Sequence, residues 1–287
     1  MRVTNVATPI TVTNRGRQPK RSKAGGLALI IASPAAAVLL FLKLLSVTSD
    51  YRFWIYGGAF LLLGALGGIG TGLQLRAPDA LELMRRDPRP PIVFLRSFQE
   101  DHRVIHGSPT GDREGGEYVA NTQRKASHEH ALARLLRSVG PFVAVGQPGE
   151  PLATLGAARV YLADHEWKDT VESMVHRAGA VVLQPEFSSG TLWEVELVVR
   201  AVDLRRLLLV VPNPAVRPLR FTRVRQLIVE RFGVTLPPID TCPPCDAFYL
   251  DATKRPIPLR LDGNASQAAK PFVDHLLALG ESGRGRT

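Results

Sequence analysis

The sequence predicts an α/β protein in which a hairpin of two membrane-spanning helices precedes one domain built on a parallel sheet. Two long apolar runs fill most of residues 25–75, as membrane helices require. From residue 91 onward, apolar segments of strand length alternate with amphipathic segments of helix length. This alternation is typical of a parallel sheet covered by helices on both faces. The 287 residues are enough for one or two domains with a buried core.

The N-terminal tail, residues 1–24, holds more than half of the chain's excess positive charge. The formal net charge is +10, and six basic residues lie in this tail, whereas the first acidic residue of the chain is Asp50. Charge concentrated in a short tail can fix the orientation of a membrane protein, and it does not by itself indicate binding to nucleic acid. We therefore expect a basic cytoplasmic tail and no nucleic-acid partner.

Each apolar run is long enough to cross a bilayer. Residues 25–42 carry no charge, the apolar character continues past Lys43, and residues 53–75 are again uncharged. A spanning helix needs about 20 mostly apolar residues. We therefore expect membrane helices at about 25–47 and 53–75, which anchor the chain in the membrane. The first run and its basic flank also fit a cleaved signal peptide, but that alternative leaves the second run unexplained.

The Lys and Arg residues beside the two runs predict the orientation. Residues 1–24 and 76–89 are rich in these residues, whereas the loop between the runs has only Arg52, offset by Asp50. The positive-inside rule therefore places both termini and the folded domain in the cytoplasm. The sequence predicts a multi-pass protein of the cell membrane.

The remaining chain divides into a linker, one domain and a short tail. Residues 76–90 are amphipathic and end in prolines, and we interpret them as a juxtamembrane linker. The domain is expected to span residues 91–280, and residues 281–287 are expected to be disordered. Its predicted strands cover residues 91–98, 142–146, 159–163, 180–185, 206–212, 247–251 and 257–261. Its predicted helices cover residues 123–140, 165–179, 191–204, 219–233 and 265–280.

Cysteine and histidine give no sign of a metal site or a cofactor. The only two cysteines, Cys242 and Cys245, form one C-P-P-C motif in a proline-rich connection. Such a motif can be a redox pair or half of a zinc site. No second Cys or His pair lies nearby at zinc-ligand spacing, and we interpret the motif as two thiols in a loop. The His-Glu-His sequence at 128–130 has the wrong spacing for two ligands on one helix face, and we interpret it as solvated.

Polar turns follow four of the predicted strands and define the candidate site, because ligands of open parallel sheets bind beyond the carboxyl ends of the strands. These turns are residues 96–101, 146–151, 163–167 and 184–194. The candidate ligand-binding residues are Arg96, Ser97, Phe98, Asp101, Asp164, Ser189, Gly190, Thr191 and Trp193. For two of them a structural role is also open: Arg96 can pair with Glu100 or Asp101, and Asp164 can cap the helix that follows.

The last of these turns resembles known families. The sequence Ser-Ser-Gly-Thr-Leu-Trp-Glu at 188–194 is similar to the Gly-Thr-x-x-Glu turn of nucleoside 2-deoxyribosyltransferases. It is also similar to the Ser…Trp…Glu region of bacterial TIR and TIR-like NAD-cleaving domains. The sequence Val-Phe-Leu-Arg-Ser-Phe at 93–98 resembles the opening strand of TIR domains. The resemblance covers roughly residues 91–212, and it implies a flavodoxin-like or TIR-like parallel sheet with a nucleotide ligand.

The resemblance also implies a reactive role for Glu194. In the transferases the matching glutamate attacks or stabilises the ribose C1′. In TIR domains the glutamate usually lies four positions after the tryptophan, where this chain has Leu197, and Glu196 is therefore an alternate candidate. A carboxylate beside the sugar stabilises the oxocarbenium-like state of N-glycosidic cleavage, and Phe98 or Trp193 can hold a base by stacking. The helix N-terminus is expected to keep the carboxylate ionised.

A structural role for Glu194 is the main alternative. Residues 191–194 also match a capping box, with Thr191 as N-cap and Glu194 hydrogen-bonded to the backbone of its own helix. The apolar positions of this helix do not decide between the two roles, since Glu194 and Glu196 flank the apolar stripe about equally.

Two functions follow from these observations, and both place the domain at the membrane. In the first, a cytoplasmic TIR-like domain binds a nucleotide or cleaves the N-glycosidic bond of NAD or of a nucleoside, with Glu194 as the reactive group. In the second, a non-catalytic module of the same fold signals or interacts with other proteins, including copies of itself. A third, plainer function is assembly with neighbouring proteins alone.

Overall fold

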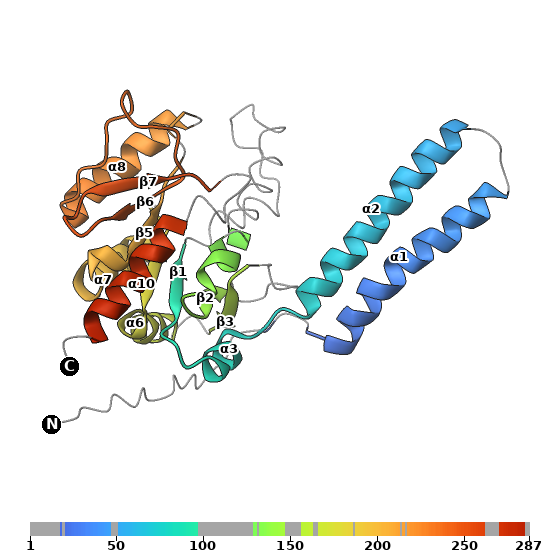
Figure 1. The fold of residues 1–287 in the computed structure, drawn as a ribbon, viewed down its shortest axis with the longest axis horizontal. Helices are drawn as coiled ribbons and strands as arrows, with labels where there is room; N and C mark the ends of the chain where they lie inside the picture. Colours follow the sequence, from blue (N-terminus) through green and yellow to red (C-terminus); the bar gives the residue numbers. More distant parts are fainter. Residues whose placement is uncertain are drawn as a thin grey trace. The chain divides into compact units, whose positions relative to one another are not determined.

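The computed structural model describes residues 18, 21–46, 51–96, 129–130, 132–146, 156–162, 166–185, 187–212, 214–215, 217–261 and 270–284. These residues form two compact units (Figure 1). One, the hairpin unit, contains the helices before residue 79, and the other, the α/β unit, contains the sheet and everything that packs on it.

The hairpin unit consists of two long apolar helices that pack against each other. They are α1 (Lys23–Leu45) and α2 (Tyr51–Leu75), and both are long and apolar enough to cross a membrane. Small residues line their contact: a Cβ atom added at Gly68 would lie 2.4 Å from the Cβ atom of Ser33, and one at Gly72 would lie 2.6 Å from the carbonyl oxygen of Gly26. The helices approach closely because these positions carry almost no side chain. The predicted helical hairpin is confirmed.

In the part of the chain that the structure describes, seven strands of the α/β unit form one sheet in the order β3-β2-β1-β4-β5-β6-β7. The strands are β1 (Ile92–Leu95), β2 (Phe142–Gly146), β3 (Ala158–Tyr161), β4 (Ala180–Leu183), β5 (Leu207–Val210), β6 (Ala247–Leu250) and β7 (Pro256–Leu259). The first five are parallel, whereas β6 and β7 are each antiparallel to the strand before them.

The prediction of a fully parallel sheet is therefore wrong at one edge, where β6 and β7 run antiparallel to their neighbours. A short turn joins β6 to β7, and the Asp251 side chain accepts hydrogen bonds there from the backbone N–H groups of Thr253 and Arg255. Only antiparallel neighbours can be joined by so short a turn, because parallel strands need a long crossover.

The strand order also corrects the expected flavodoxin-like arrangement. In that arrangement the third strand lies between the first and the fourth, whereas here β3 lies at the edge of the sheet and pairs with β2. The connection from β2 to β3, residues 147–157, is too short to carry a helical crossover over an intervening strand, so that β3 takes the place beside β2. The observed order is that of the other common doubly wound sheet, with a reversed edge.

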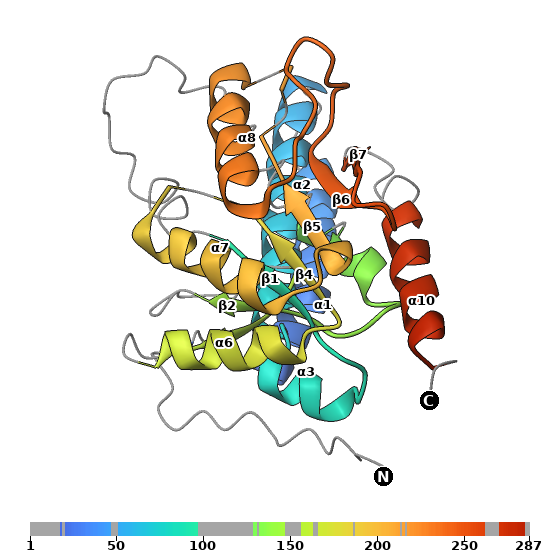
Figure 2. The ribbon, with the colours of Figure 1, turned by 90° about the vertical axis from the view of Figure 1, so that its left-hand side faces the viewer.

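Helices cover both faces of the sheet, as the continuous apolar strands predict. Helices α6 (Trp167–Arg177), α7 (Ser189–Ala201) and α8 (Pro218–Phe232) lie on one face, and α10 (Lys270–Arg284) lies on the other (Figure 2). The segment at 132–136 packs on the same face as α10. Alternate residues of β1 serve the two cores: Val93 and Leu95 belong to the first, Ile92 and Phe94 to the second.

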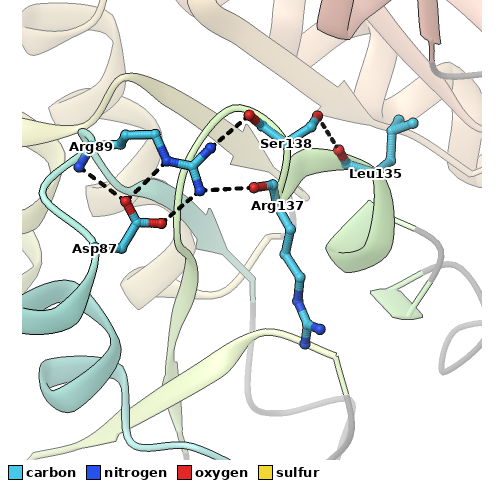
Figure 3. Close-up of polar contacts among 5 residues, drawn as sticks. All are labelled: Asp87, Arg89, Leu135, Arg137 and Ser138. Atoms are coloured by element: carbon cyan, nitrogen blue, oxygen red, sulfur yellow. Dashed lines mark hydrogen bonds and ion pairs between the residues drawn. The ribbon is translucent and has the colours of Figure 1, made fainter.

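Residues 79–91, which precede β1, belong to the α/β unit, although the sequence predicts a linker over 76–90. They include α3 (Ala80–Arg86), whose first two residues are buried in the core. After α3, Arg89 donates hydrogen bonds to the carbonyl oxygens of Ser138 at 2.7 Å and Arg137 at 3.1 Å, and it pairs with Asp87 (Figure 3). The guanidinium of Arg89 lowers the pKa of Asp87. The structure therefore ties this segment to the domain.

The C-terminal helix runs further than the sequence predicts. Helix α10 continues to Arg284, past residue 281 where the disordered tail was expected to begin. Gly280 lies inside the helix rather than after it. A single glycine lowers helix stability by only about 1 kcal/mol, which explains why it does not end α10.

Candidate functional site

The candidate site lies where β1 and β4 run side by side in the middle of the sheet. From β1 the chain continues to β2 on one side, and from β4 it continues to β5 on the other. The crevice beyond the carboxyl ends of two such strands is the usual ligand site of a doubly wound sheet. The two strand ends stay together, because the backbone N–H of Gln184 donates to the carbonyl oxygen of Leu95 at 2.9 Å. Arg96 follows β1 at this point, and α7 follows β4.

The structure describes only part of the predicted site. Ser97, Phe98, Asp101 and Asp164 lie outside the described residues. The described candidates are Arg96, Ser189, Gly190, Thr191, Trp193, Glu194 and Glu196.

Helix α7 begins earlier than the sequence predicts. Its N-cap is Ser188, whose backbone is extended and whose Oγ atom accepts a hydrogen bond from the Thr191 backbone N–H at 3.3 Å. Ser188 Oγ also lies 2.9 Å from Thr191 Oγ1. Thr191 is therefore inside the first turn and is not the cap, while Glu194 lies in the second turn. The capping box proposed for Glu194 is wrong, because the preceding serine starts the helix.

Glu194 is buried on the face of α7 that packs into the core. Only 6% of its surface is exposed, and its Oε2 atom makes no hydrogen bond to any residue that the structure describes. Thr191, Val195 and Val198 are buried along the same face. Burial raises the pKa of the Glu194 carboxyl to about 8, because an apolar environment disfavours the charged form. The carboxyl is thus mostly protonated at neutral pH, and the expected ionisation by the helix N-terminus is wrong, since desolvation outweighs it.

Glu196, the alternate candidate, has a different environment. Its side chain is 54% exposed, and its Oε1 atom lies 3.2 Å from Nη1 of Arg231 on α8. The structure therefore separates two glutamates that the apolar pattern left equivalent. Glu194 is the buried one of the pair, and Glu196 forms a surface ion pair.

Trp193 packs against a second tryptophan that the sequence analysis did not select as a site residue. Its ring meets Trp167 of α6 edge to face, with centroids 4.9 Å apart and an interplanar angle of 76°. The Nζ atom of Lys168 lies 5.5 Å from the Trp193 ring centroid and 5.8 Å from that of Trp167. A Cβ atom added at Gly190 would lie 3.9 Å from the Trp167 ring. The starts of α6 and α7 thus share an aromatic and basic cluster: Trp167, Lys168 and Trp193.

The only sequence signal for this cluster is its position. Trp167 ends the polar turn at 163–167, one of the four turns selected at the carboxyl ends of strands. The pairing of Trp167 with Trp193 depends on how α6 packs beside α7, which no local pattern reports.

Arg96 belongs to a different cluster. Its Nη1 atom lies 3.4 Å from Oε2 of Glu129, and its guanidinium lies 5.8 Å from the Phe94 ring centroid. Glu129 also accepts hydrogen bonds from Arg159 Nη2 at 3.0 and 3.1 Å and from the Ala157 backbone N–H at 3.1 Å. Glu129 and Arg159 are buried. The expectation that the His-Glu-His sequence is solvated is wrong for Glu129, because its carboxylate holds two arginines.

The structure does not bring Arg96 together with Glu194. Phe94, which Arg96 approaches, faces the core covered by α10, whereas α7 covers the opposite face. Among the described residues, burial is the cause of the raised pKa of Glu194. Its carboxyl is therefore mostly neutral, and it can both donate and accept a hydrogen bond.

Within the described ranges, no group of three or more His, Cys, Asp or Glu side chains is arranged to hold a metal ion. No protein-family model, no curated protein and no solved structure matches this chain. The similarity to deoxyribosyltransferases and TIR domains consequently depends on the quoted residues alone, and no family is identified.

Proposed function

We propose that the α/β unit is a membrane-anchored cytoplasmic domain that binds a nucleotide at the carboxyl ends of β1 and β4. The observation that supports this most is Glu194, a buried carboxyl on the helix that follows β4, with an oxygen that has no hydrogen-bond partner among the described residues. Leaving such an atom unsatisfied costs about 1–3 kcal/mol. Buried polar atoms of this kind are rare, and they concentrate at functional sites.

The residues around Glu194 suit this class of ligand. The first backbone N–H groups of α7, at Ser189 and Gly190, lie at a helix N-terminus, where phosphate binds readily. The neutral carboxyl of Glu194 can donate to a ribose hydroxyl or to a base edge. The similarity of residues 188–194 to nucleoside-binding and NAD-binding turns supports the same ligand class.

A second candidate function is cleavage of the N-glycosidic bond of NAD or of a nucleoside. It is favoured by the position of Glu194 after Gly190 and Thr191, as in the transferase turn. In this reaction the bond from C1′ to the base breaks, and water finally adds at C1′. A nucleophilic or charge-stabilising Glu194 has to be ionised. With its pKa at about 8, cleavage would accelerate as the pH rises through that value.

Binding and cleavage can be separated by two substitutions at the same position. Glutamine resembles a protonated glutamate in shape and in its ability to donate a hydrogen bond. The binding proposal therefore predicts that Glu194→Gln keeps nucleotide affinity within about threefold, whereas Glu194→Leu weakens it by about tenfold or more, equivalent to about 1.4 kcal/mol. Glu196→Gln is the matched control and should bind like the wild type.

The test uses the full chain in detergent micelles, because truncation after α3 would remove core residues. Binding of NAD, adenine nucleotides and deoxynucleosides is measured by calorimetry, and release of free base is followed by chromatography. If the wild type releases free base and Glu194→Gln does not, the protein cleaves the N-glycosidic bond, and this function replaces the binding proposal. Absence of binding to every nucleotide would overturn both, and it would leave the signalling or interaction module, tested by self-association of the same sample.

A further inference from the structure

The two cysteines of the α/β unit lie close together, although neither is part of the proposed nucleotide site. Both are free thiols, and Cys242 Sγ lies 3.8 Å from Cys245 Sγ. A disulfide needs a sulfur separation of about 2.05 Å. Side-chain rotation can close the difference only if the backbone already holds the two residues facing each other.

The backbone on either side of the motif is fixed by hydrogen bonds and burial, while the two sulfur atoms are 3.8 Å apart. The Cys242 N–H donates to the carbonyl oxygen of Pro238 at 2.8 Å, which fixes the first cysteine on a turn. Cys245 is completely buried in the core, immediately before β6. The backbone N–H of the next residue, Asp246, donates a hydrogen bond to the carbonyl oxygen of Leu259 at 2.8 Å. The Oδ2 atom of its side chain accepts one from the backbone N–H of Leu261 at 3.0 Å. The two ends of the motif are therefore anchored independently, and two prolines with restricted φ angles join them.

The two thiols differ in their exposure to solvent, and we therefore expect them to react in a fixed order. Cys242 is half-buried, and solvent reaches part of it, whereas Cys245 is covered. A reagent can therefore meet Cys242 first, and Cys245 can react only with Cys242.

We propose that Cys242 and Cys245 form a site of reversible disulfide modification, with a small disulfide such as oxidised glutathione as the oxidant. Cys242 loses its proton and attacks the small disulfide, which forms a mixed disulfide and releases one thiolate. Cys245 then loses its proton and attacks Cys242 Sγ, which forms the Sγ–Sγ bond and releases the second thiolate. The cysteine pair loses two electrons and two protons, and the small disulfide becomes two thiols.

The environment of the pair indicates slow exchange rather than rapid catalysis. Burial raises the pKa of both thiols, and the neighbouring Cys242 raises that of Cys245 further. Reactive cysteines of disulfide-exchange enzymes have lowered pKa values instead. Since the thiolate is the attacking species, we expect oxidation to accelerate as the pH rises.

The test uses the full chain in detergent micelles, incubated with oxidised glutathione and analysed by thiol titration and mass spectrometry. The wild type is expected to lose both thiols together, to become lighter by two hydrogens and to keep no glutathione. Dithiothreitol should restore both thiols. The Cys245→Ser variant is expected to stop at a stable glutathione adduct on Cys242, and the Cys242→Ser variant is expected not to react.

The wild-type measurement alone decides the proposal if either variant fails to fold. A glutathione adduct that persists on Cys242 beside a reduced Cys245, two thiols that remain titratable, or a disulfide between two chains on a non-reducing gel would each overturn it. The outcome is independent of nucleotide binding, because the motif lies outside the crevice residues named above.

Discussion

At the scale of single residues, Glu194 makes stability depend on pH. Its pKa is raised from 4.5 to about 8 in the folded protein. At pH values between these two numbers, the folded state therefore keeps a proton that the unfolded state has lost. The free energy of unfolding therefore falls as the pH rises from about 4.5 to about 8, by a few kcal/mol in total. Glu194→Gln removes this titration and should flatten the profile, as measured by urea unfolding of the full chain in detergent at a series of pH values.

The matched control for this profile is Glu196→Gln. Glu196 is exposed and paired with Arg231, and an exposed ion pair contributes little to stability. This variant should keep the wild-type decline with pH. If Glu194→Gln declined as steeply as the wild type, burial of Glu194 could not be the source of the pH dependence.

Glu129 illustrates a residue that the sequence could not reveal. Its partners Arg96 and Arg159 lie about thirty positions away on either side in the chain, and ion pairs between distant segments leave no periodic pattern. Glu194 and Trp193, in contrast, stand in one short turn after a predicted strand, where a local motif can point to them. The turn at 184–194 can therefore be recognised from the sequence, whereas the buried Glu129 cluster cannot.

Removing the charge of Glu129 should destabilise the domain. Glu129→Gln removes the buried carboxylate that Arg159 and Arg96 contact, and breaking a buried ion pair in this way costs about 3–5 kcal/mol. Equilibrium urea unfolding measures the loss. The neighbouring His130, which is exposed, provides the control His130→Gln with an expected change within about 0.5 kcal/mol. Equal stability of the two variants would contradict the structural role of the cluster.

At the scale of elements, the start of α7 depends on Ser188 rather than on Thr191. Removing an N-cap hydroxyl costs about 1 kcal/mol, and Ser188→Ala should lower the free energy of unfolding by this amount. Ser189→Ala is the matched control, because Ser189 is exposed and is the first residue of the helix. The two variants are compared by urea unfolding at one pH. A larger loss for Ser189→Ala would mean that the helix starts one residue later.

The boundaries of elements were predicted less well than their order. Every strand and helix that the structure bounds between residue 91 and residue 284 overlaps a predicted one, because alternating apolar and amphipathic segments are strong signals. The start of α7 was misplaced, since adjacent serines and a threonine can all act as caps. Helix α3 was missed, because a seven-residue helix is too short to show periodicity.

The contact between α1 and α2 gives a prediction for the hairpin unit. A side chain at Gly68 would collide with Ser33, whereas one at Gly67 would meet nothing within 4 Å. Gly68→Leu should therefore separate the helices, and Gly67→Leu should leave them packed, since close packing of small residues drives their association.

Cross-linking measures this packing directly. A Cβ atom at Gly57 would lie 3.7 Å from Leu44 Cδ1. We therefore expect cysteines at positions 57 and 44 to form a disulfide upon oxidation. The native cysteines are replaced by alanine in this experiment. Gly68→Leu should reduce the yield severalfold, and Gly67→Leu should not. Equal yields in both variants would mean that Gly68 does not set the distance between the helices.

At the scale of the whole molecule, the sequence predicts the two parts of the chain but not how the sheet is ordered. Apolar runs and charge distribution are local properties, and they identify the hairpin and the α/β unit. The order of β3, β2 and β1 and the reversal of β6 and β7 are not local properties of the sequence. The switch point of the sheet lies between β1 and β4, which are neighbours in the observed order.

The basic residues of the chain predict its orientation in a membrane. Residues 1–24 carry six, and residues 46–52, around the turn from α1 to α2, carry only Arg52 beside Asp50. We expect the C-terminus inside, so that a C-terminal green fluorescent protein is fluorescent and a C-terminal alkaline phosphatase is inactive in a bacterial host. Replacing the six basic residues by glutamine and adding lysines to the loop should produce a mixed or inverted population.

An N-terminal tag distinguishes an anchored hairpin from a cleaved signal peptide. The hairpin keeps the tag on the mature chain, whereas signal cleavage after the first apolar run removes it and leaves α2 as a single span. A retained tag together with an inactive C-terminal phosphatase supports the predicted topology. An active phosphatase would place the α/β unit outside the cytoplasm, where two neighbouring thiols such as Cys242 and Cys245 would be expected to persist as a disulfide.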